Sequence, residues 1–433
     1  MKASGNKTTP AQAPAGLLWR ITLLAVLLLC LIPRAEANDS KVILLATHPE
    51  KQAEKTGPEQ NQDDIQRLLA CIFKNVGLNY EIVHIPWARA KRELSRNSVD
   101  GIFLTSFSEN TAGVNTQPIY LEKWFAFSHK NTLSDLRDQR IGVIRESDIA
   151  HWLNKQGINP YIMAASYQQL VEQFNAGRFD VFIADIRLLE RASGASALLA
   201  SLHRHFVRYM AKGLTFSAEF VRDNPELVRA FNNRIKQCNP AITDVNAAES
   251  AIIRQFAEHA VISPLPETVL ARAAALAARD AQLSDTQIVQ RDKAWQENIA
   301  RQQRNTFMQA MMDNPVSAHL RKLSENVPEI KEVFITDEYG VLLGTSALLS
   351  DYYQGDEEKV TALTGRDSQV SDISFDASTG NFISHYSRRL QAPDGTALIA
   401  IVGLSLDDIF RGHDFTQAES AIQAPDTDAN YTR

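Results

Sequence analysis

Short apolar runs alternate with amphipathic stretches along the first half of the chain. Runs rich in β-branched residues predict strands, and apolar residues at helical spacing predict helices between them. The expected strands are 41–46, 80–85, 99–104, 140–144, 161–164 and 181–184, and the expected helices are 63–76, 87–96, 149–155 and 167–176. These elements form two sets with the same order. The rhythm predicts two similar α/β lobes, each with a largely parallel sheet.

A long stretch without proline or glycine follows these lobes, from Glu267 to Asp313. Its composition favours one or two long helices that end before Pro315. Apolar residues recur along it at steps near helical spacing, namely Leu283, Ile288, Trp295, Ile299, Phe307 and Met311. Two interpretations stay open: the stripe packs on the following domain, or it pairs two copies of the chain as a homodimer through this helical connector.

The last part of the chain has the pattern of an antiparallel sheet. Two apolar runs, 332–336 and 341–345, flank Asp337-Glu-Tyr-Gly340, which predicts a β-hairpin with glycine in the left-handed position. Further strands are expected at 369–375, 382–390 and 397–404. Together with the helix before them, they predict an α+β module.

The N-terminus has the pattern of an export signal. Basic residues precede or begin an apolar core at 21–32, and Ala35-Glu36-Ala37 follows as a small-x-small cleavage site. We expect cleavage after Ala37 and a periplasmic mature protein. An uncleaved anchor is the alternative, because the residues just before this core lengthen the apolar run.

Export leaves two cysteines, Cys71 and Cys238, in an oxidising compartment. Cys71 lies on the expected helix 63–76, and Cys238 lies at a second helix-like segment, 225–237, so the two cysteines are near the two ends of the first module. We predict a disulfide between them, and the alternative is a pair of buried thiols.

Composition and the motifs present narrow the classes of function that this protein could have. A formal net charge of −6 and a pI near 6.0 provide no basic field for phosphate backbones, so no nucleic-acid partner is expected. The chain contains no nucleophile elbow, P-loop, dinucleotide fingerprint or zinc-protease motif. The sequence therefore predicts no enzymatic activity, no metal and no cofactor.

The order of elements in the first module resembles the periplasmic solute-binding proteins of the amino-acid-transporter type, family 3. The matching segments are Asp100-Gly101, Pro118-Ile-Tyr120 to Phe127, Arg140-Ile-Gly-Val143 and 179–185. This resemblance implies a bilobed α/β fold of the periplasmic binding protein type II kind, which captures a small polar solute by lobe closure.

The same resemblance suggests where the solute binds. An acidic residue at the end of a second-lobe strand holds the ligand ammonium in that family, and Asp185 occupies this place. An arginine after the third strand grips the carboxylate, but 105–111 contains none. Arg89 and Arg145 are the predicted substitutes.

Trp87, Thr105 and Ser106 complete the predicted set in the first module. Each charged or aromatic member also has a structural interpretation. Asp185 would cap a helix, the two arginines would be surface charges, and Trp87 would pack in the core.

The run Ser350-Asp-Tyr-Tyr-Gln-Gly-Asp-Glu-Glu358 resembles the PAS-like extracytoplasmic sensor domains called PDC or Cache domains. This resemblance implies an α+β domain with a ligand pocket on one face of its sheet. The predicted pocket residues are Tyr352, Tyr353, Gln354, Asp356 and Asp372. The alternative is that Asp351 and Asp356 brace the loop beneath the sheet.

These observations predict five segments: a signal peptide at 1–37, a bilobed solute-binding domain at 38–240, a helical connector at 241–294, a Cache-like domain at 295–410 and a polar tail at 411–433. The expected function is capture of a small polar solute and relay of that event to a membrane sensor or transporter. The alternative is a non-catalytic adaptor whose ligand clefts have degenerated and which binds such a membrane partner.

Overall fold

The structure is a computed structural model that describes residues 42–47, 58–106, 113–190, 198–238, 244–376, 380–411, 413 and 415. The predicted signal peptide and most of the predicted polar tail lie outside the described residues. Contacts within the chain separate residues 1–42 from one compact unit at 43–433. All that follows concerns that unit.

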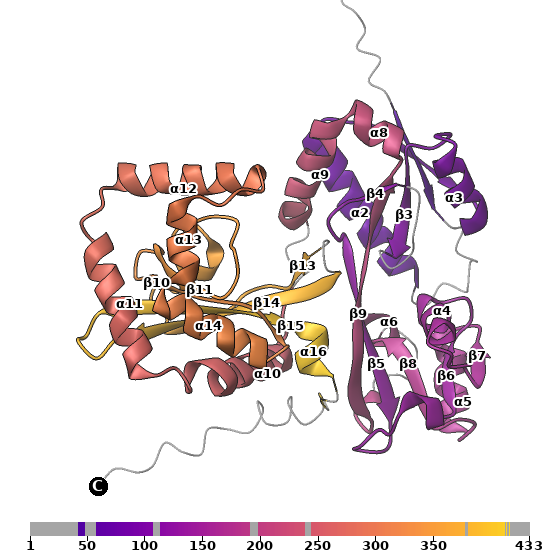
Figure 1. Ribbon diagram of the computed structural model, residues 1–433. Helices are drawn as coiled ribbons and strands as arrows, with labels where there is room; N and C mark the ends of the chain where they lie inside the picture. The colour runs from indigo at the N-terminus through magenta and orange to yellow at the C-terminus, as the bar shows by residue number, and fades with distance from the viewer. Residues whose placement is uncertain are drawn as a thin grey trace, which may run out of the picture. The chain divides into compact units, whose positions relative to one another are not determined.

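A nine-stranded mixed sheet forms the first module (Figure 1). Its strands are β1 Ile43–Thr47, β2 Tyr80–His84, β3 Gly101–Ser106, β4 Val114–Asn115, β5 Tyr120–Ser128, β6 Ile141–Ile144, β7 Ile162–Ala164, β8 Val181–Asp185 and β9 His203–Phe216. The order is β2-β1-β3-β9-β5-β8-β6-β7, with β4 paired to β9. Strands β1 to β3 and β6 to β8 pair in parallel, which confirms the two predicted βαβ sets.

Two antiparallel strands in the middle of this sheet differ from the prediction of largely parallel lobes. β9 is 14 residues long and pairs antiparallel with both β3 and β5, so it runs from one parallel set to the other. β5 also pairs antiparallel with β8. The two lobes are therefore joined by a continuous hydrogen-bonded sheet.

Serine side chains begin three helices of this module. Ser147, Ser166 and Ser217 each accept a hydrogen bond from a backbone N–H in the first turn, as N-caps do. The helices are α2 Pro58–Val76, α3 Trp87–Ser95, α4 Asp148–Lys155, α5 Tyr167–Asn175, α6 Ile186–Glu190, α8 Ala218–Asp223 and α9 Pro225–Cys238. A disulfide joins Cys71 in α2 to Cys238 in α9, with the Cα atoms 5.9 Å apart, as the sequence predicted.

The predicted connector and the start of the following domain contain several helices, where the sequence predicted one or two long ones over 267–313. They are α10 Ala247–Ala257, a π-helical turn Glu258–Ile262, α11 Glu267–Asp280, α12 Asp285–Ala300, α13 Thr306–Asp313 and α14 Pro315–Asn326. Ser284 and Asn305 cap new helices within the Pro- and Gly-free stretch, and Gln302 has a left-handed φ of 54° after α12. Local capping interrupts the helix although propensity favours its continuation.

The apolar stripe predicted within 267–313 packs inside the chain. Trp295, Met308 and Met311 are buried against Phe334 and Ile401 of the second sheet, as the first interpretation of the stripe expects. The homodimer stays a prediction. Among the described helices, none is by itself long and apolar enough to cross a membrane, whereas the bent pair Ala247–Ile262 and Glu267–Asp280 passes that test of length and composition jointly.

The second sheet is antiparallel throughout. Its strands are β10 Ile330–Asp337, β11 Leu342–Thr345, β12 Ser368–Val370, β13 Ser374–Asp376, β14 Asn381–Gln391 and β15 Ala397–Ser405, in the order β11-β10-β15-β14-β12 with β13 on β14. The predicted hairpin is present, and Gly340 has a φ of 89°. Helices α11 and α14 contact one face, while the loop 346–367 and the end of α12 contribute to the core on the other. Short helices α15 Glu358–Thr361 and α16 Leu406–Phe410 complete the module.

A buried ion pair ties the first sheet to the connector. The Lys123 ammonium on β5 lies 2.7 Å and 2.8 Å from the two carboxylate oxygens of Glu249 on α10. The Tyr209 hydroxyl on β9 donates to the same carboxylate at 2.7 Å. Glu249 is also the third residue of a capping box with Asn246, and its side chain is fully buried.

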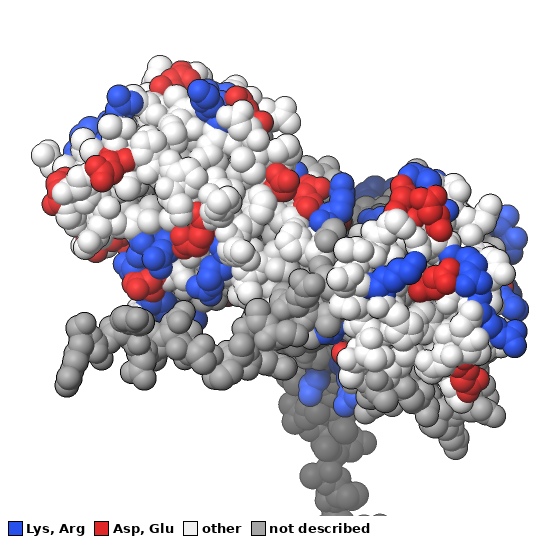
Figure 2. All heavy atoms as spheres, turned by 90° about the horizontal axis from the view of Figure 1, so that it is seen from below, with Lys and Arg blue, Asp and Glu red and all other residues white. Residues whose placement is uncertain are grey.

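Acidic and basic side chains are interspersed on the face of the molecule in Figure 2. No broad field of a single sign is visible on that face among the described residues.

Candidate functional site

The carboxyl ends of the parallel strands β6, β7 and β8 meet at one edge of the first sheet. In open α/β sheets, ligands bind in the crevice outside these strand ends. Asp148 follows β6, Tyr167 follows β7, and Asp185 ends β8. Two of the predicted ligand residues, Asp185 and Arg145, therefore lie at the ends of strands that share a lobe.

Asp185 is 1% exposed and holds backbone amides with both of its oxygens. Oδ2 accepts from the Lys123 N–H at 2.8 Å, and Oδ1 accepts from the Leu188 N–H at 3.0 Å. The second bond is that of a cap on α6, as the structural interpretation expects. Burial raises the pKa of this carboxyl, while Arg187 and the two amides act in the opposite direction. Binding of a ligand ammonium by Asp185 stays a prediction.

A second buried carboxylate, Glu122 on β5, is neutralised within the protein. The Lys212 ammonium lies 2.6 Å from Glu122 Oε1 and 2.7 Å from Asp148 Oδ2, and the Trp124 indole donates to Glu122 Oε2 at 2.7 Å. Burial raises the pKa of Glu122. Burial alone lowers the pKa of Lys212, but its two carboxylate neighbours hold that pKa above the ordinary value. Lys212 is therefore a charged group that is already paired.

Arg187, in the first turn of α6, forms no salt bridge with any described residue, although its charge acts on Asp185. Its Nε and Nη2 atoms are buried, and neither has a hydrogen-bond partner in the described part of the chain. The guanidinium carbon lies 4.5 Å from the centroid of the Tyr120 ring. A buried donor without an acceptor costs about 1–3 kcal/mol, and more when it is charged. The sequence analysis did not identify Arg187, and its only signal was its place two residues after Asp185.

The remaining first-module candidates have structural contacts. The Thr105 hydroxyl lies 2.6 Å from that of Thr215, and the Ser106 hydroxyl donates to Met210 Sδ at 2.8 Å. Trp87 is half-buried and packs against a core cluster of the first lobe. Their roles as ligand residues stay predictions.

The two predicted substitute arginines are both exposed. Arg89 on α3 faces Glu93 at 3.6 Å with 60% of its side chain exposed. Arg145 follows β6, and its backbone N–H donates to the Ala164 carbonyl. Neither has the buried, unpartnered donors that distinguish Arg187. Ligand binding by Arg89 or Arg145 is untested.

In the second module, the run 350–358, which contains four of the predicted pocket residues, forms a loop that packs on the core. The carboxylate of Asp292 on α12 accepts from the backbone N–H groups of Tyr352 and Tyr353, both at 2.9 Å. Tyr352 is fully buried, and its ring centroid is 5.1 Å from that of Phe307. Burial raises the pKa of its hydroxyl to about 12.

Some polar residues of this loop hold it in place by hydrogen bonds, and others are exposed. Gln354 is fully buried, and its amide donates to Asp351 Oδ1 at 2.7 Å, so Asp351 braces the loop as the structural interpretation expects. Asp356 is exposed, and its side chain makes no bracing contact of this kind with the part of the chain that the structure describes. Binding of a ligand by the four loop residues Tyr352, Tyr353, Gln354 and Asp356 stays a prediction.

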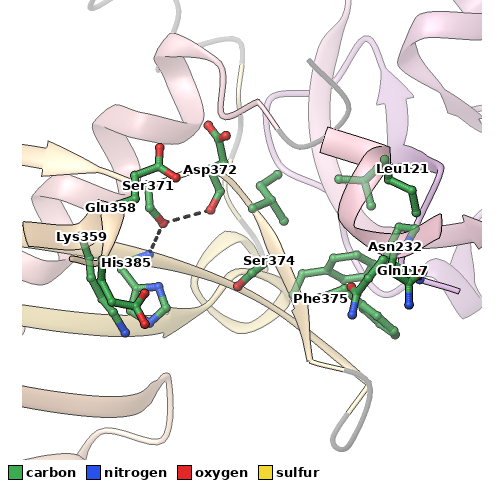
Figure 3. A pocket seen from close by; sticks show the side chains of 15 residues that line it. Gln117, Leu121, Asn232, Glu358, Lys359, Ser371, Asp372, Ser374, Phe375 and His385 are labelled. Carbon is green, nitrogen blue, oxygen red and sulfur yellow. Dashed lines mark hydrogen bonds between the residues drawn. The ribbon is translucent and has the colours of Figure 1, made fainter. Parts of the chain in front are cut away.

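Asp372 lines a cavity of about 490 Å³, which the four loop residues do not line. Figure 3 shows this cavity. One wall comes from 371–375 and β14, and a second comes from 357–359 around the start of α15. Residues of the first module, including Gln117, Leu121 and Asn232, form the rest. The sequence analysis predicted only Asp372 among the residues that surround this space.

An ion pair crosses the middle strand of the second sheet beside this cavity. His385 Nε2 on β14 lies 2.7 Å from Glu332 Oε1 on β10, and both residues pair in register with Gly403 on β15. A Cβ atom at Gly403 would lie 2.7 Å from Glu332 Cγ and 3.2 Å from His385 Nε2. Glycine therefore leaves the space in which the two side chains meet.

We expect Glu332→Gln to reduce stability at neutral pH but not in acid. Burial raises the pKa of Glu332, but the hydrogen bond and charge of His385 outweigh it, so the pKa lies below the ordinary 4.5. The carboxylate thus contributes stability above pH 4.5 that is lost as the pH falls through the lowered pKa. Thermal unfolding from pH 7 to pH 3 measures this effect. The free energy of unfolding should be lower than that of wild type by an amount on the order of 1 kcal/mol at neutral pH, and this difference should shrink below about pH 4.5. A constant difference across this range would contradict the prediction.

No group of three or more His, Cys, Asp or Glu side chains placed to hold a metal ion occurs among the residues that the structure describes.

No family model and no curated protein matches this chain. Solved structures resemble part of it. A histidine kinase sensor domain with similarity to periplasmic binding proteins is 15% identical, with a TM-score of 0.34, and covers 46% of this chain and 91% of its own. The arginine-, lysine-, histidine-binding protein ArtJ from Geobacillus stearothermophilus is 17% identical, with a TM-score of 0.34 and coverages of 46% and 90%.

The GluR0 ligand-binding core from Nostoc punctiforme, in complex with glutamate, is 13% identical, with a TM-score of 0.34, and covers 47% of this chain and all of its own. None of these comparisons supports the predicted Cache identity of the second sheet. They reach about half of the chain, and in that part it resembles amino-acid-binding proteins and a sensor domain.

Proposed function

We propose that this protein binds a small polar solute with a carboxylate or similar anionic group at the strand ends of its first module. The observation that carries the proposal is Arg187, whose two buried donors lack acceptors among the described residues. Such a charge is stabilised when an anion supplies the missing acceptors. The proposed role is binding, without catalysis.

The surroundings of Arg187 suit an anion held in a fixed orientation. A guanidinium presents parallel N–H groups that match the two oxygens of a carboxylate. The Tyr120 ring 4.5 Å away holds the guanidinium plane by a cation–π contact. Lys212 is already paired with Glu122 and Asp148, so it does not compete for the same anion.

A cationic group on the same solute would find carboxylates nearby. Asp185 lies two residues from Arg187. Its charge also reaches Tyr120, the ring that contacts Arg187, because the pKa of Tyr120 is raised first by burial and then by the charge of Asp185. A solute with both a carboxylate and an ammonium therefore fits this edge better than a simple anion does. We propose Asp185 as the ammonium partner, in agreement with the sequence prediction.

The proposed relay begins in the strands that frame this edge. β5 contains Tyr120, Glu122 and Lys123, and the last of these is bonded to Glu249 on α10. A movement of β5 on solute binding would thus act on the connector and on the second module, for which we propose a Cache-like sensor role. The receiver would be a membrane sensor or transporter.

The Cys71–Cys238 disulfide indicates an extracytoplasmic location, because such bonds persist in oxidising compartments. A periplasmic location after cleavage at Ala37 is part of the proposal.

The test uses the mature chain, residues 38–433, in a thermal-shift screen of amino acids, dicarboxylates, polyamines and small sugars, followed by calorimetry. A solute at 100 times its Kd should stabilise the protein by about 2.7 kcal/mol. In Arg187→Met, we expect the affinity to fall by at least about 30-fold, because loss of a buried charged partner costs 2 kcal/mol or more. Arg187→Lys should restore it only partly, because an ammonium lacks the planar fork.

Arg89→Met and Arg145→Met are the matched controls, since each removes one exposed guanidinium. Affinity lost in Arg145→Met but kept in Arg187→Met would refute the assignment to Arg187. No shift with any solute, together with co-purification of a membrane protein, would favour the adaptor with degenerate clefts.

A further inference from the structure

A second cavity, of about 810 Å³, lies in the lobe that contains β6 to β8. Its volume is in the size range of small-molecule sites. The loop 131–136, which leads into the amino end of β6, forms one wall, and the other walls come from α4, β5, β9 and α16. Neither Arg187 nor Asp185 lines it, so this cavity and the proposed solute site are distinct.

Arg208 on β9 presents a guanidinium without an ion-pair partner to this cavity. Its Nε donates to the Tyr209 carbonyl at 3.2 Å, and no hydrogen bond or salt bridge joins its Nη groups to a described residue. The guanidinium carbon lies 5.9 Å from the ring centroids of both Trp124 and Trp152. These cation–π contacts hold the guanidinium but supply no acceptor. Burial lowers the pKa of Arg208, because it disfavours the charged form.

Asp407 on α16 presents a carboxylate without an ion-pair partner to the same cavity. Its Oδ1 accepts from the Tyr209 N–H at 3.1 Å, and Oδ2 has no hydrogen-bond partner in the described part of the chain. Arg208 and Asp407 thus hold the carbonyl and the N–H of one residue. Their charges act on each other, but no salt bridge joins these two described residues. Burial raises the pKa of Asp407, because it disfavours the ionised carboxylate.

The other charged side chains at this cavity have partners. Asp135 lies 3.0 Å from the Arg137 guanidinium, and Arg411, which is 77% exposed, lies 3.4 Å from Asp408. His205 Nε2 lies 3.1 Å from a backbone carbonyl. Among the described residues, the wall therefore leaves one guanidinium and one carboxylate without a counter-ion in contact. A ligand that carries one charge of each sign complements them.

Apolar side chains also line the cavity. Leu133 and Leu136 lie in the loop, Trp152 lies on α4, and Phe206 lies on β9. Trp152 is half-buried, and its ring centroid is 6.1 Å from that of Trp124. Such a wall accommodates an apolar stem, because the stem removes these side chains from water.

We propose that this cavity binds a small dipolar solute with an apolar stem. The anionic group of the solute accepts hydrogen bonds from the Arg208 Nη groups, and its ammonium lies at Asp407 Oδ2. The stem lies against Trp152 and the leucines of the loop. Because Arg208 belongs to the first sheet and Asp407 to the second module, the bound solute contacts both. The inference does not rest on the proposed function, since it uses none of the residues at the first site.

The experiment is calorimetry with three compounds that share one stem: phenylalanine, N-acetylphenylalanine and phenylalanine amide. At about pH 6.5, where an α-amino group is mostly protonated, the first carries both charges, the second only the carboxylate and the third only the ammonium. They are titrated into the wild-type chain, residues 38–433, and into its Arg187→Met variant, in which the first site does not contribute. In both, we expect phenylalanine to bind at least about tenfold more tightly than either derivative.

Two substitutions separate the charges. Arg208→Met should lower the affinity for phenylalanine to that for the amide without weakening the amide, because only the carboxylate loses its partner. Asp407→Asn should lower it to that for N-acetylphenylalanine without weakening that compound, because the ammonium loses its partner while Oδ1 still accepts from the Tyr209 N–H. Arg411→Met and Asp135→Asn are matched controls that remove a paired charge from the same wall and should leave all three affinities unchanged.

Similar affinities for the three compounds in Arg187→Met would overturn the proposal, as would phenylalanine binding that survives both Arg208→Met and Asp407→Asn. Absence of binding up to about 1 mM in Arg187→Met would also overturn it. Wild-type binding that vanishes in Arg187→Met would belong to the first site, so that result would support the proposed function and refute this inference. The comparison of the three compounds leaves the cavity unaltered and therefore does not depend on the stability of any cavity variant.

Discussion

Replacement of Lys123 by methionine is expected to lower the free energy of unfolding of the mature chain by about 3–5 kcal/mol. The substitution leaves the Glu249 carboxylate fully buried without the ammonium that now lies 2.7 Å from it. Glu249 would keep the Tyr209 hydroxyl and the Asn246 N–H, which donate hydrogen bonds but supply no charge. Urea denaturation followed by circular dichroism measures the shift of the transition.

A double-mutant cycle separates the ion pair from packing. Lys123→Met with Glu249→Gln removes both charges and keeps the shape of the capping side chain, so the double variant should be more stable than the sum of the single effects by more than about 1 kcal/mol. Arg140→Met is the control, because the Arg140–Asp180 pair is 48% and 40% exposed and should contribute at most about 1 kcal/mol. Equal losses in Lys123→Met and Arg140→Met would refute the argument.

Reduction of the Cys71–Cys238 disulfide is expected to cost about 2–5 kcal/mol. The bond closes a loop with a sequence separation of 167, and the entropy it removes from the unfolded chain grows with the logarithm of that length. The melting temperature of the oxidised mature chain should therefore fall when dithiothreitol is added.

The double variant Cys71→Ser/Cys238→Ser should melt near the reduced protein, and dithiothreitol should not change it further. The chain used in these experiments, residues 38–433, does not contain Cys30 and so offers no other thiol. A reductant effect that persists in the double variant would show that the loss comes from elsewhere.

The parallel strands of the first module were predictable because each is a compact apolar run near its helix. β9 was not predicted, because its sequence places Arg208 and Lys212 among buried residues. Charges within a run favour a loop when only neighbours in sequence are considered. Lys212 is tolerated in the strand because Glu122, 90 positions earlier, lies beside it after folding. Pairing over such a separation leaves no local signal.

In the candidate sites too, residues with a local sequence signal were predictable, and residues that are marked only by contacts in the folded chain were not. Asp185 could be singled out from its place at the end of a strand. Arg187 could not, because the property that marks it is the absence of an acceptor around two of its nitrogens in the folded chain. In the loop at 350–358, the sequence indicated a special segment. It could not show that Tyr352 and Gln354 are directed into the core, with Asp292 of a distant helix holding the loop backbone.

The double role of Glu249 has a consequence for cutting or recombining this protein. A fragment that ends at residue 240, where the composition suggests a boundary, would retain Lys123 and Tyr209 but lose the carboxylate that accepts from both. Its β9 surface would then expose apolar side chains that α10 helps to bury, and an exposed apolar patch promotes aggregation. A fragment boundary placed after α10 would keep Glu249 together with Lys123 and Tyr209. The unit that can be exchanged between proteins is thus longer than the unit that binds a solute.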